Sequence, residues 1–161
     1  MTSSQPEKIF ELTAIIRLRQ RLAATRALTF SATPGARSST DWAGRGYGEV
    51  QIKDDGTSVR FHEQGTFQHA SGREMPFRNV YRFDIAERRL SLYHERFGAT
   101  RAVFLFDMAP MAEDRFESLA PHLCVRDLYS GALHIDGTGF DLIWSIEGPR
   151  KQERIHYRYT P

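Results

Sequence analysis

From residue 41 onward, the sequence is a succession of strand-like segments separated by tight turns. The turns include Asp55-Gly56 and Ser71-Gly72, which are residue types that favour chain reversal. Parallel strands need long crossover connections, and only residues 109–120 leave room for a short helical or irregular connection. The pattern therefore predicts an antiparallel meander, which loses its exposed edges when it closes into a barrel. The expected strands are 27–33, 41–53, 57–68, 77–86, 89–97, 101–108, 122–135, 140–147 and 154–159.

The segment 5–25 precedes the strands and has the residue spacing of a helix. Ser4 and Glu7 fit a capping box, and Pro6 is tolerated in a first turn, where the backbone N–H has no partner. We expect this helix to dock on the barrel as a cap; the alternative is a basic amphipathic helix that binds a membrane surface or a partner. The apolar residues at helical spacing are Ile9, Leu12, Ile15, Ile16 and Leu22.

Length and composition are those of one globular domain. A chain of 161 residues with 40% hydrophobic residues is able to bury a sizeable core without a disulfide or a structural metal. We therefore expect a single all-β domain over 1–161, with the helix at 5–25 and the barrel at 27–160. An up-and-down barrel of this size has about eight to ten strands.

The same features exclude several classes of partner. No apolar run is long enough to span a membrane, and the N-terminus lacks the apolar core of a secretory signal, so we expect a cytoplasmic protein. The net charge is +2 and the arginines are spread along the chain, which is typical of a solvated surface and not of a nucleic-acid footprint. The single cysteine excludes an internal disulfide and a multi-cysteine zinc site, and no metal is predicted.

Alternation along the strands predicts which side chains face inward, because residues two apart share a face. Glu63 shares a face with Phe61, and His94 shares one with Leu92. Polar residues on an apolar face are informative, since burying them is costly without a partner. A carboxylate, an arginine and phenols that face one cavity are able to hold the polar end of a ligand. The candidate ligand-binding residues are Phe61, Glu63, Asn79, Tyr81, His94, Arg96, Asp127, Tyr129, Trp144 and Tyr157.

The stretch 121–129 contains the only cysteine, Cys124, two residues after His122. Two residues apart on a strand is about 6.6 Å at the backbone, and a nucleophile would also need an orienting group and an oxyanion hole. The sequence shows neither, and a lone buried cysteine usually behaves as a small hydrophobe. We therefore favour Asp127 and Tyr129, which share a face with apolar residues, as the ligand-facing residues of this stretch.

The blocks at 78–83, 90–98 and 121–129, with the Gly-Pro-Arg-Lys at 148–151, form a specific pattern. In this pattern the sequence resembles the uncharacterised domain-of-unknown-function 6314 family. That family has no established activity, and its general pattern is similar to the lipocalin-like, or calycin, barrels, which bind fatty acids, retinoids and haem. The calycin pattern places a Gly-x-Trp early in the chain, whereas Trp42 here follows Asp41 and precedes Ala43 and Gly44. The resemblance covers roughly residues 25–160 and rests on 44–50, 78–83, 90–98, 104–107, 121–129, 144, 148–151 and 157–159.

Three functions follow from this pattern. The first is binding of a small, mostly apolar or amphipathic molecule with a polar or acidic end inside a calycin-like barrel, with Arg96 facing the acidic group. The second is an enzyme of isomerase, cyclase or hydrolase type that uses Glu63 or Asp127 with His94 as acid–base groups. The third is a haem-binding or protein-interaction module. No cofactor is required, although His94 is the candidate ligand if haem binds.

Overall fold

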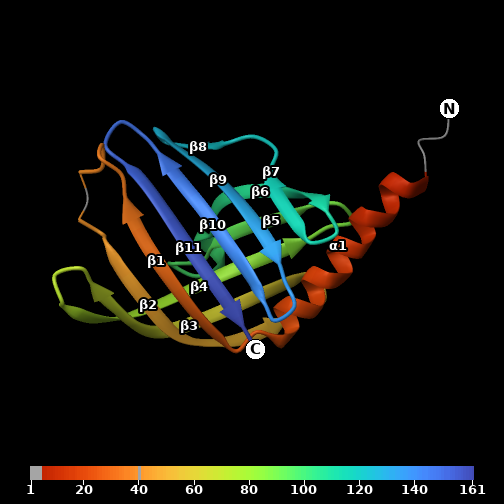
Figure 1. Ribbon diagram of the computed structural model, residues 1–161, viewed down its shortest axis with the longest axis horizontal. Helices are drawn as coiled ribbons and strands as arrows, with labels where there is room; N and C mark the ends of the chain where they lie inside the picture. The colour runs from red at the N-terminus through yellow and green to blue at the C-terminus, as the bar shows by residue number, and fades with distance from the viewer. Residues whose placement is uncertain (1–4, 40) are drawn as a thin grey trace.

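The chain forms a closed antiparallel β-barrel with one α-helix at one end (Figure 1). The computed structural model describes residues 5–39 and 41–161, with side chains from residue 9 onward. The elements are α1 (Gln5–Ala24), β1 (Ala27–Pro34), β2 (Gly44–Asp54), β3 (Ser58–His69), β4 (Glu74–Ile85), β5 (Leu90–His94), the 3-10 turn η1 (Ala99–Arg101), β6 (Val103–Ala112), β7 (Arg115–Ser118), β8 (His122–Cys124), β9 (Asp127–Ile135), β10 (Phe140–Glu147) and β11 (Gln152–Thr160).

Ring closure depends on β1, which lies between β2 and β11 (Figure 1). Ala27 is opposite Glu49 of β2 on one side and Thr160 of β11 on the other. The sheet has 11 strands, and all except β8 belong to the ring, which therefore has ten strands. The predicted all-β antiparallel barrel with an N-terminal helix is confirmed.

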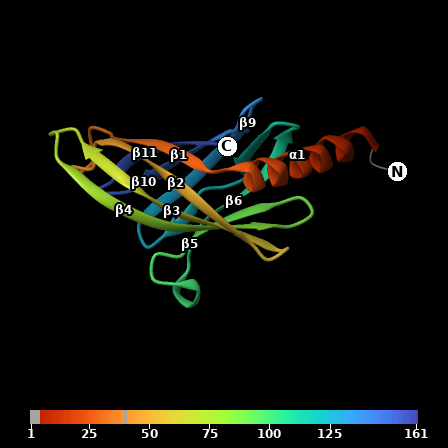
Figure 2. The same ribbon diagram turned by 90° about the horizontal axis from the view of Figure 1, so that it is seen from below.

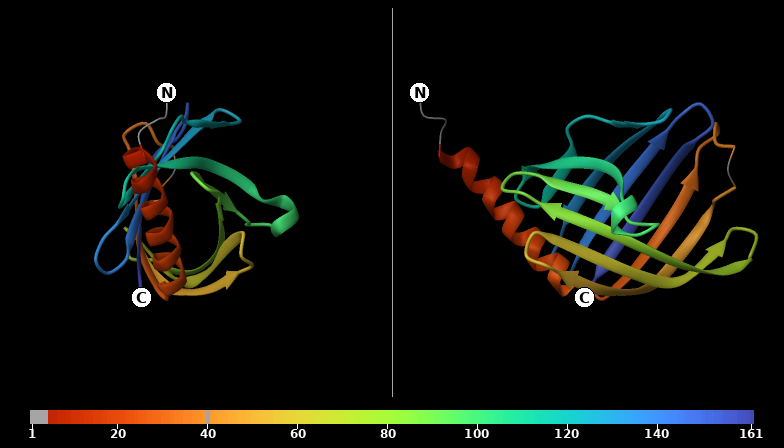
Figure 3. Two further views of the ribbon diagram at one scale, coloured as in Figure 1. Left: turned by 90° about the vertical axis from the view of Figure 1, so that its right-hand side faces the viewer. Right: turned by 180° about the vertical axis from the view of Figure 1, so that it is seen from behind.

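The α1 helix lies at the end of the barrel where the β6–β7 and β9–β10 turns meet (Figure 3). The Arg21 guanidinium donates hydrogen bonds of 2.7 and 3.1 Å to the backbone carbonyl of Asp136 in the β9–β10 turn. Arg17 lies 3.5 Å from Glu113 of the β6–β7 turn. These contacts fix the helix against this end, which we call the closed end; the opposite end is the open end. The buried side chains of the helix are Ala14, Ile15, Leu18 and Leu22.

Only part of the predicted apolar face of α1 is buried. Ile15 and Leu22 face the barrel, whereas Ile9, Leu12 and Ile16 are 60%, 58% and 50% exposed. Leu18 lies three residues after Ile15 and Leu22 lies four residues after Leu18, so the buried side chains form one stripe along the helix that faces the barrel. Ser4 of the predicted capping box lies outside the described residues. Among the described residues, no helix combines the length and apolar character needed to span a bilayer.

The barrel interior is packed with aromatic and aliphatic side chains toward α1 and is looser at the open end. Alternate residues of each strand point inward, as a pleated strand requires. Four inward-facing side chains near the open end, Phe30, Phe77, Tyr129 and Ile155, are only partly buried. Solvent therefore reaches the inner wall at the open end. The α1 helix lies beside the closed end (Figure 2). The fully buried large side chains are Tyr159, Phe61, Phe83, Phe106, Phe116, Phe140, Leu18, Leu22, Leu90, Leu92, Met108 and Leu133.

The stretch expected as one strand over 122–135 is a hairpin of β8 and β9. Cys124 is opposite Asp127, and Val125 and Arg126 form the turn between them. Val125 has φ of 60° and its side chain is 89% exposed, an unusual conformation for a β-branched residue. The connection expected over 109–120 is also different, because it completes β6 and forms β7.

Substitution of Gly131, on the inner face of β9, is expected to destabilise the barrel. A Cβ atom at this position would overlap the buried ring of Phe106. We predict that Gly131→Ala lowers the free energy of unfolding by about 1–3 kcal/mol, because overpacking forces the core to shift. Gly137→Ala is the control, since nothing lies within 4 Å of its added Cβ. Urea unfolding measures both, and equal changes for the two variants would contradict the prediction.

Candidate functional site

The inner wall carries one group of polar and aromatic side chains, which we call the interior cluster. Strand pairing brings its members together: Glu63 of β3 is directly opposite Asn79 of β4, and Tyr81 of β4 is opposite His94 of β5. Side chains from β10 and β11 approach from across the barrel. The members of the interior cluster are Glu63, Asn79, Tyr81, His94, Trp144, Tyr157 and Tyr159.

Tyr81 is the centre of the interior cluster. Its hydroxyl lies 3.1 Å from the hydroxyl of Tyr157, a hydrogen bond that crosses the lumen because β4 and β11 are not neighbours. Its ring stacks on the imidazole of His94 with 4.8 Å between centroids. The ring of Trp144 meets it edge-on at 6.5 Å. Burial raises the pKa of Tyr81 and Tyr157, so both phenols stay protonated.

Glu63 is a carboxyl group inside the barrel, with 2% of its surface exposed. The Tyr159 hydroxyl donates a 2.7 Å hydrogen bond to its Oε2. Burial raises the pKa of Glu63 to about 8, although interactions with Tyr159 and Asn79 offset part of this effect. The group is therefore mostly protonated at neutral pH and is able to donate as well as accept a hydrogen bond.

Three polar atoms of the interior cluster are buried without a well-formed hydrogen bond. They are Oε1 of Glu63, Nε2 of His94 and Nε1 of Trp144. Burial and the charge of Arg96 lower the pKa of His94, so its ring is neutral at neutral pH. An unpaired buried polar group costs roughly 1–3 kcal/mol, and most native groups of this kind have a partner. The three atoms therefore offer hydrogen-bonding capacity to a small molecule or to water.

Most of the residues predicted to bind a ligand lie on the inner wall. Phe61 packs against the ring of Phe83 at 4.9 Å and belongs to the fully buried part of the core. Tyr129 is half-buried near the open end, and its ring stacks on Trp144 at 6.4 Å. Together with the interior cluster, these residues form one continuous aromatic wall.

Arg96 and Asp127 are not brought to the inner wall. The β5 strand ends at His94, so alternation no longer applies at Arg96, which is exposed with its guanidinium 5.4 Å from the centre of the Phe97 ring. Asp127 is at the hairpin turn on the rim, 3.8 Å from the ammonium of Lys151. Asp127 is therefore at the open end and Arg96 in the loop between β5 and β6, and both charges lie outside the interior cluster.

Sequence reasoning missed Tyr159 as a site residue. The face of Tyr159 was readable, because it is two residues from Tyr157 on β11 and shares its face, but the partner of its hydroxyl was not. The hydrogen bond to Glu63 joins residues 96 positions apart, and no local pattern predicts such a pairing.

The other reactive side chains do not form a site of their own. Cys124 is a free, half-buried thiol, and the ring of its neighbour His122 packs against Phe104 at 4.6 Å. Within the part of the chain that the structure describes, no three His, Cys, Asp or Glu side chains gather so as to hold a metal ion.

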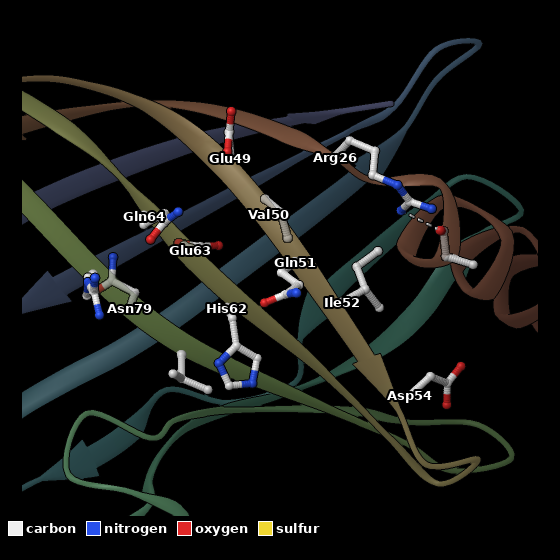
Figure 4. A pocket seen from close by; sticks show the side chains of 13 residues that line it. Arg26, Glu49, Val50, Gln51, Ile52, Asp54, His62, Glu63, Gln64 and Asn79 are labelled. Carbon is white, nitrogen blue, oxygen red and sulfur yellow. Dashed lines mark hydrogen bonds between the residues drawn. The ribbon is translucent and has the colours of Figure 1, made fainter.

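A polar hollow of about 890 Å³ lies on the outer side of β2, β3 and β4 (Figure 4). Its outward-facing side chains include Gln51, His62 and Gln64. Glu63 and Asn79 also border it, so the hollow and the interior cluster share one part of the barrel wall. The hollow holds both acidic and basic groups, and nothing in its charge pattern selects one ligand class.

These features define a closed, helix-capped antiparallel β-barrel with a polar and aromatic interior. The chain belongs to the family of unknown function DUF6314, whose model matches residues 35–161. The match begins after β1, so it leaves out both α1 and the strand that closes the ring. No curated protein and no solved structure matches the chain.

The buried carboxyl of Glu63 is expected to make the stability of the fold depend on pH. Its pKa is about 8 in the folded protein against an ordinary 4.5, so the burial of Glu63 costs no stability through its ionisation below pH 4.5, and this cost grows as pH rises from 4.5 toward 8. The loss is about 1.4 kcal/mol per pH unit within that window. We predict that Glu63→Gln flattens the dependence and that Glu87→Gln, at an exposed site, leaves it unchanged. Urea unfolding at several pH values measures this; an unchanged slope in Glu63→Gln would contradict it.

Proposed function

We propose that the barrel binds a small, mostly apolar molecule with a polar end, held in the open half of its interior. The observation that carries this proposal is the presence of three buried polar atoms without well-formed hydrogen bonds, on Glu63, His94 and Trp144. A ligand with a polar end supplies the partners that these atoms lack. Sites that bind small molecules usually have a mostly apolar wall with a small number of polar groups.

The apolar part of the ligand would contact the inner wall near the open end. Phe30, Phe77 and Ile155 line this region and are only partly buried. An apolar ligand that covers them removes their exposed surface from water, which contributes about 25 cal/mol for each Å². The polar end would then reach inward toward Tyr81.

An enzyme on the same barrel receives less support. Catalysis by paired acid and base groups needs a carboxyl within reach of His94. Among the described residues, no hydrogen bond joins His94 to Glu63 or Asp127. Haem binding rests only on the free Nε2 of His94, and a Soret band on haem titration would support it.

Ligand binding is testable through Trp144, one of the two tryptophans of the protein. In Trp42→Phe, all tryptophan fluorescence comes from Trp144, whose side chain is 7% exposed inside the barrel. We predict that decanol changes this fluorescence with saturation. Native mass spectrometry of the protein purified from its own cells is expected to show a co-purifying small molecule.

A matched pair of variants tests the location of the site. Ala32 and Thr33 are neighbours on β1 near the open end; Ala32 faces inward and Thr33 outward. Ala32→Phe places a ring in the proposed site and is expected to weaken decanol binding at least tenfold, whereas Thr33→Phe leaves it unchanged. Equal affinities in the two variants, or no saturable response of Trp144 in the parent protein, would overturn the proposal.

A further inference from the structure

From the distribution of charge in the barrel, we infer that the ligand carries an uncharged polar end, such as an alcohol or an amide, and not a carboxylate or an ammonium group. This inference rests on the proposed function and sharpens it.

Among the residues that the structure describes, the inner wall has no cation to neutralise an anionic ligand. Arg60 and Arg82 are on the outer face, where both pair with Glu95 at 2.9 and 2.8 Å. Arg96 is exposed beyond the end of β5. Burying a carboxylate without a paired cation is strongly unfavourable. The described arginines and lysines of the barrel strands alternate with inward-facing residues and so point outward: Arg45, Lys53, Arg60, Arg78, Arg82, Arg115, Arg154 and Arg158.

The interior cluster already contains an acid, which further disfavours an anion. Glu63 is buried beside the phenols of Tyr157 and Tyr159, and the Tyr159 hydroxyl donates a 2.7 Å hydrogen bond to it. When this carboxyl is protonated it adds no positive charge, and when it is ionised it repels a second negative charge. In both states a carboxylate ligand lacks a cation that would neutralise its charge.

A cationic end is disfavoured by the packing of the rings. Cation–π binding requires an open aromatic face. His94 covers one face of Tyr81, Tyr157 and Tyr159 stack on each other with 5.6 Å between centroids, and Phe140 also stacks on Tyr159 at 4.9 Å. Trp144 is stacked on a further ring in the same way. The stacked rings therefore leave an ammonium group few open faces, and the carboxyl of Glu63 is buried, which favours the uncharged acid.

The atoms without well-formed hydrogen bonds match an uncharged group. Nε1 of Trp144 is a donor only, so it needs an acceptor from the ligand. Protonated Glu63 and neutral His94 offer both donor and acceptor sites. A hydroxyl group accepts from one neighbour and donates to another, and a primary amide does the same.

A series of ligands with the same alkyl chain separates these alternatives. Decanol, decanamide, decanoate and decylammonium are titrated at neutral pH into the Trp42→Phe protein, with Trp144 fluorescence as the readout. Decanol and decanamide are expected to bind at least tenfold more tightly than the two ions. If none of the four binds, the proposed function fails. If decanoate or decylammonium binds as tightly as decanol, the function stands and the inference on the polar end is overturned.

Two kinds of variant test the residues involved. Glu63→Gln is expected to keep the affinity for decanol within about threefold, because the amide still donates and accepts. Glu63→Leu, which does neither, is expected to lower it about tenfold. Arg96→Ala is the control at an exposed site in the β5–β6 loop and is expected to change no affinity. A decanoate affinity that depends on Arg96 would place the polar end beside this loop, outside the interior cluster, and contradict the inference.

Discussion

The structure depends on a constraint that ring closure imposes on every strand. In a closed sheet, each side chain faces either the lumen or the outside, and every strand is paired on both sides. A shift of one strand by one residue would move each of its inward-facing side chains to the outside. The basic residues beside the inward-facing positions therefore remain outside, whereas the aromatic residues fill the lumen. The uncharged character of the inner wall is a direct result of this alternation.

Within that wall, Glu63 is the exception, and its surroundings explain how the fold tolerates it. Burial makes its charged form unfavourable, and the phenol of Tyr159 gives its carboxyl one good hydrogen bond. Nearby, Tyr81 and Tyr157 satisfy each other across the lumen. On the inner wall, further hydrogen-bonding capacity remains on Glu63, His94 and Trp144 of the interior cluster, so a few polar groups lie among aromatic side chains.

Much of this organisation was readable from the sequence, because turn residues and alternation are local signals. They predicted the barrel and placed Glu63, Tyr81 and Tyr157 on its inner face. Alternation failed for Arg96, because it holds only while a strand continues, and β5 ends two residues earlier. The β8–β9 turn was missed because Val125 and Arg126 carry none of the usual turn chemistry. The pairing of Glu63 with Tyr159 is a tertiary contact, and no spacing in the sequence encodes it.

The position of β1 also has a consequence for the order in which the molecule is made. Its partner β11 follows all the other strands in the chain, so the ring stays open until the ribosome has released nearly the whole barrel. Until then, the unpaired edges of β1 and β10 are able to pair with other chains, and such distant pairing is slow to form. Biosynthesis therefore has a vulnerable interval that ends only when β11 enters between the two edges. During that interval, the nascent sheet is the form of this protein that most needs protection from aggregation.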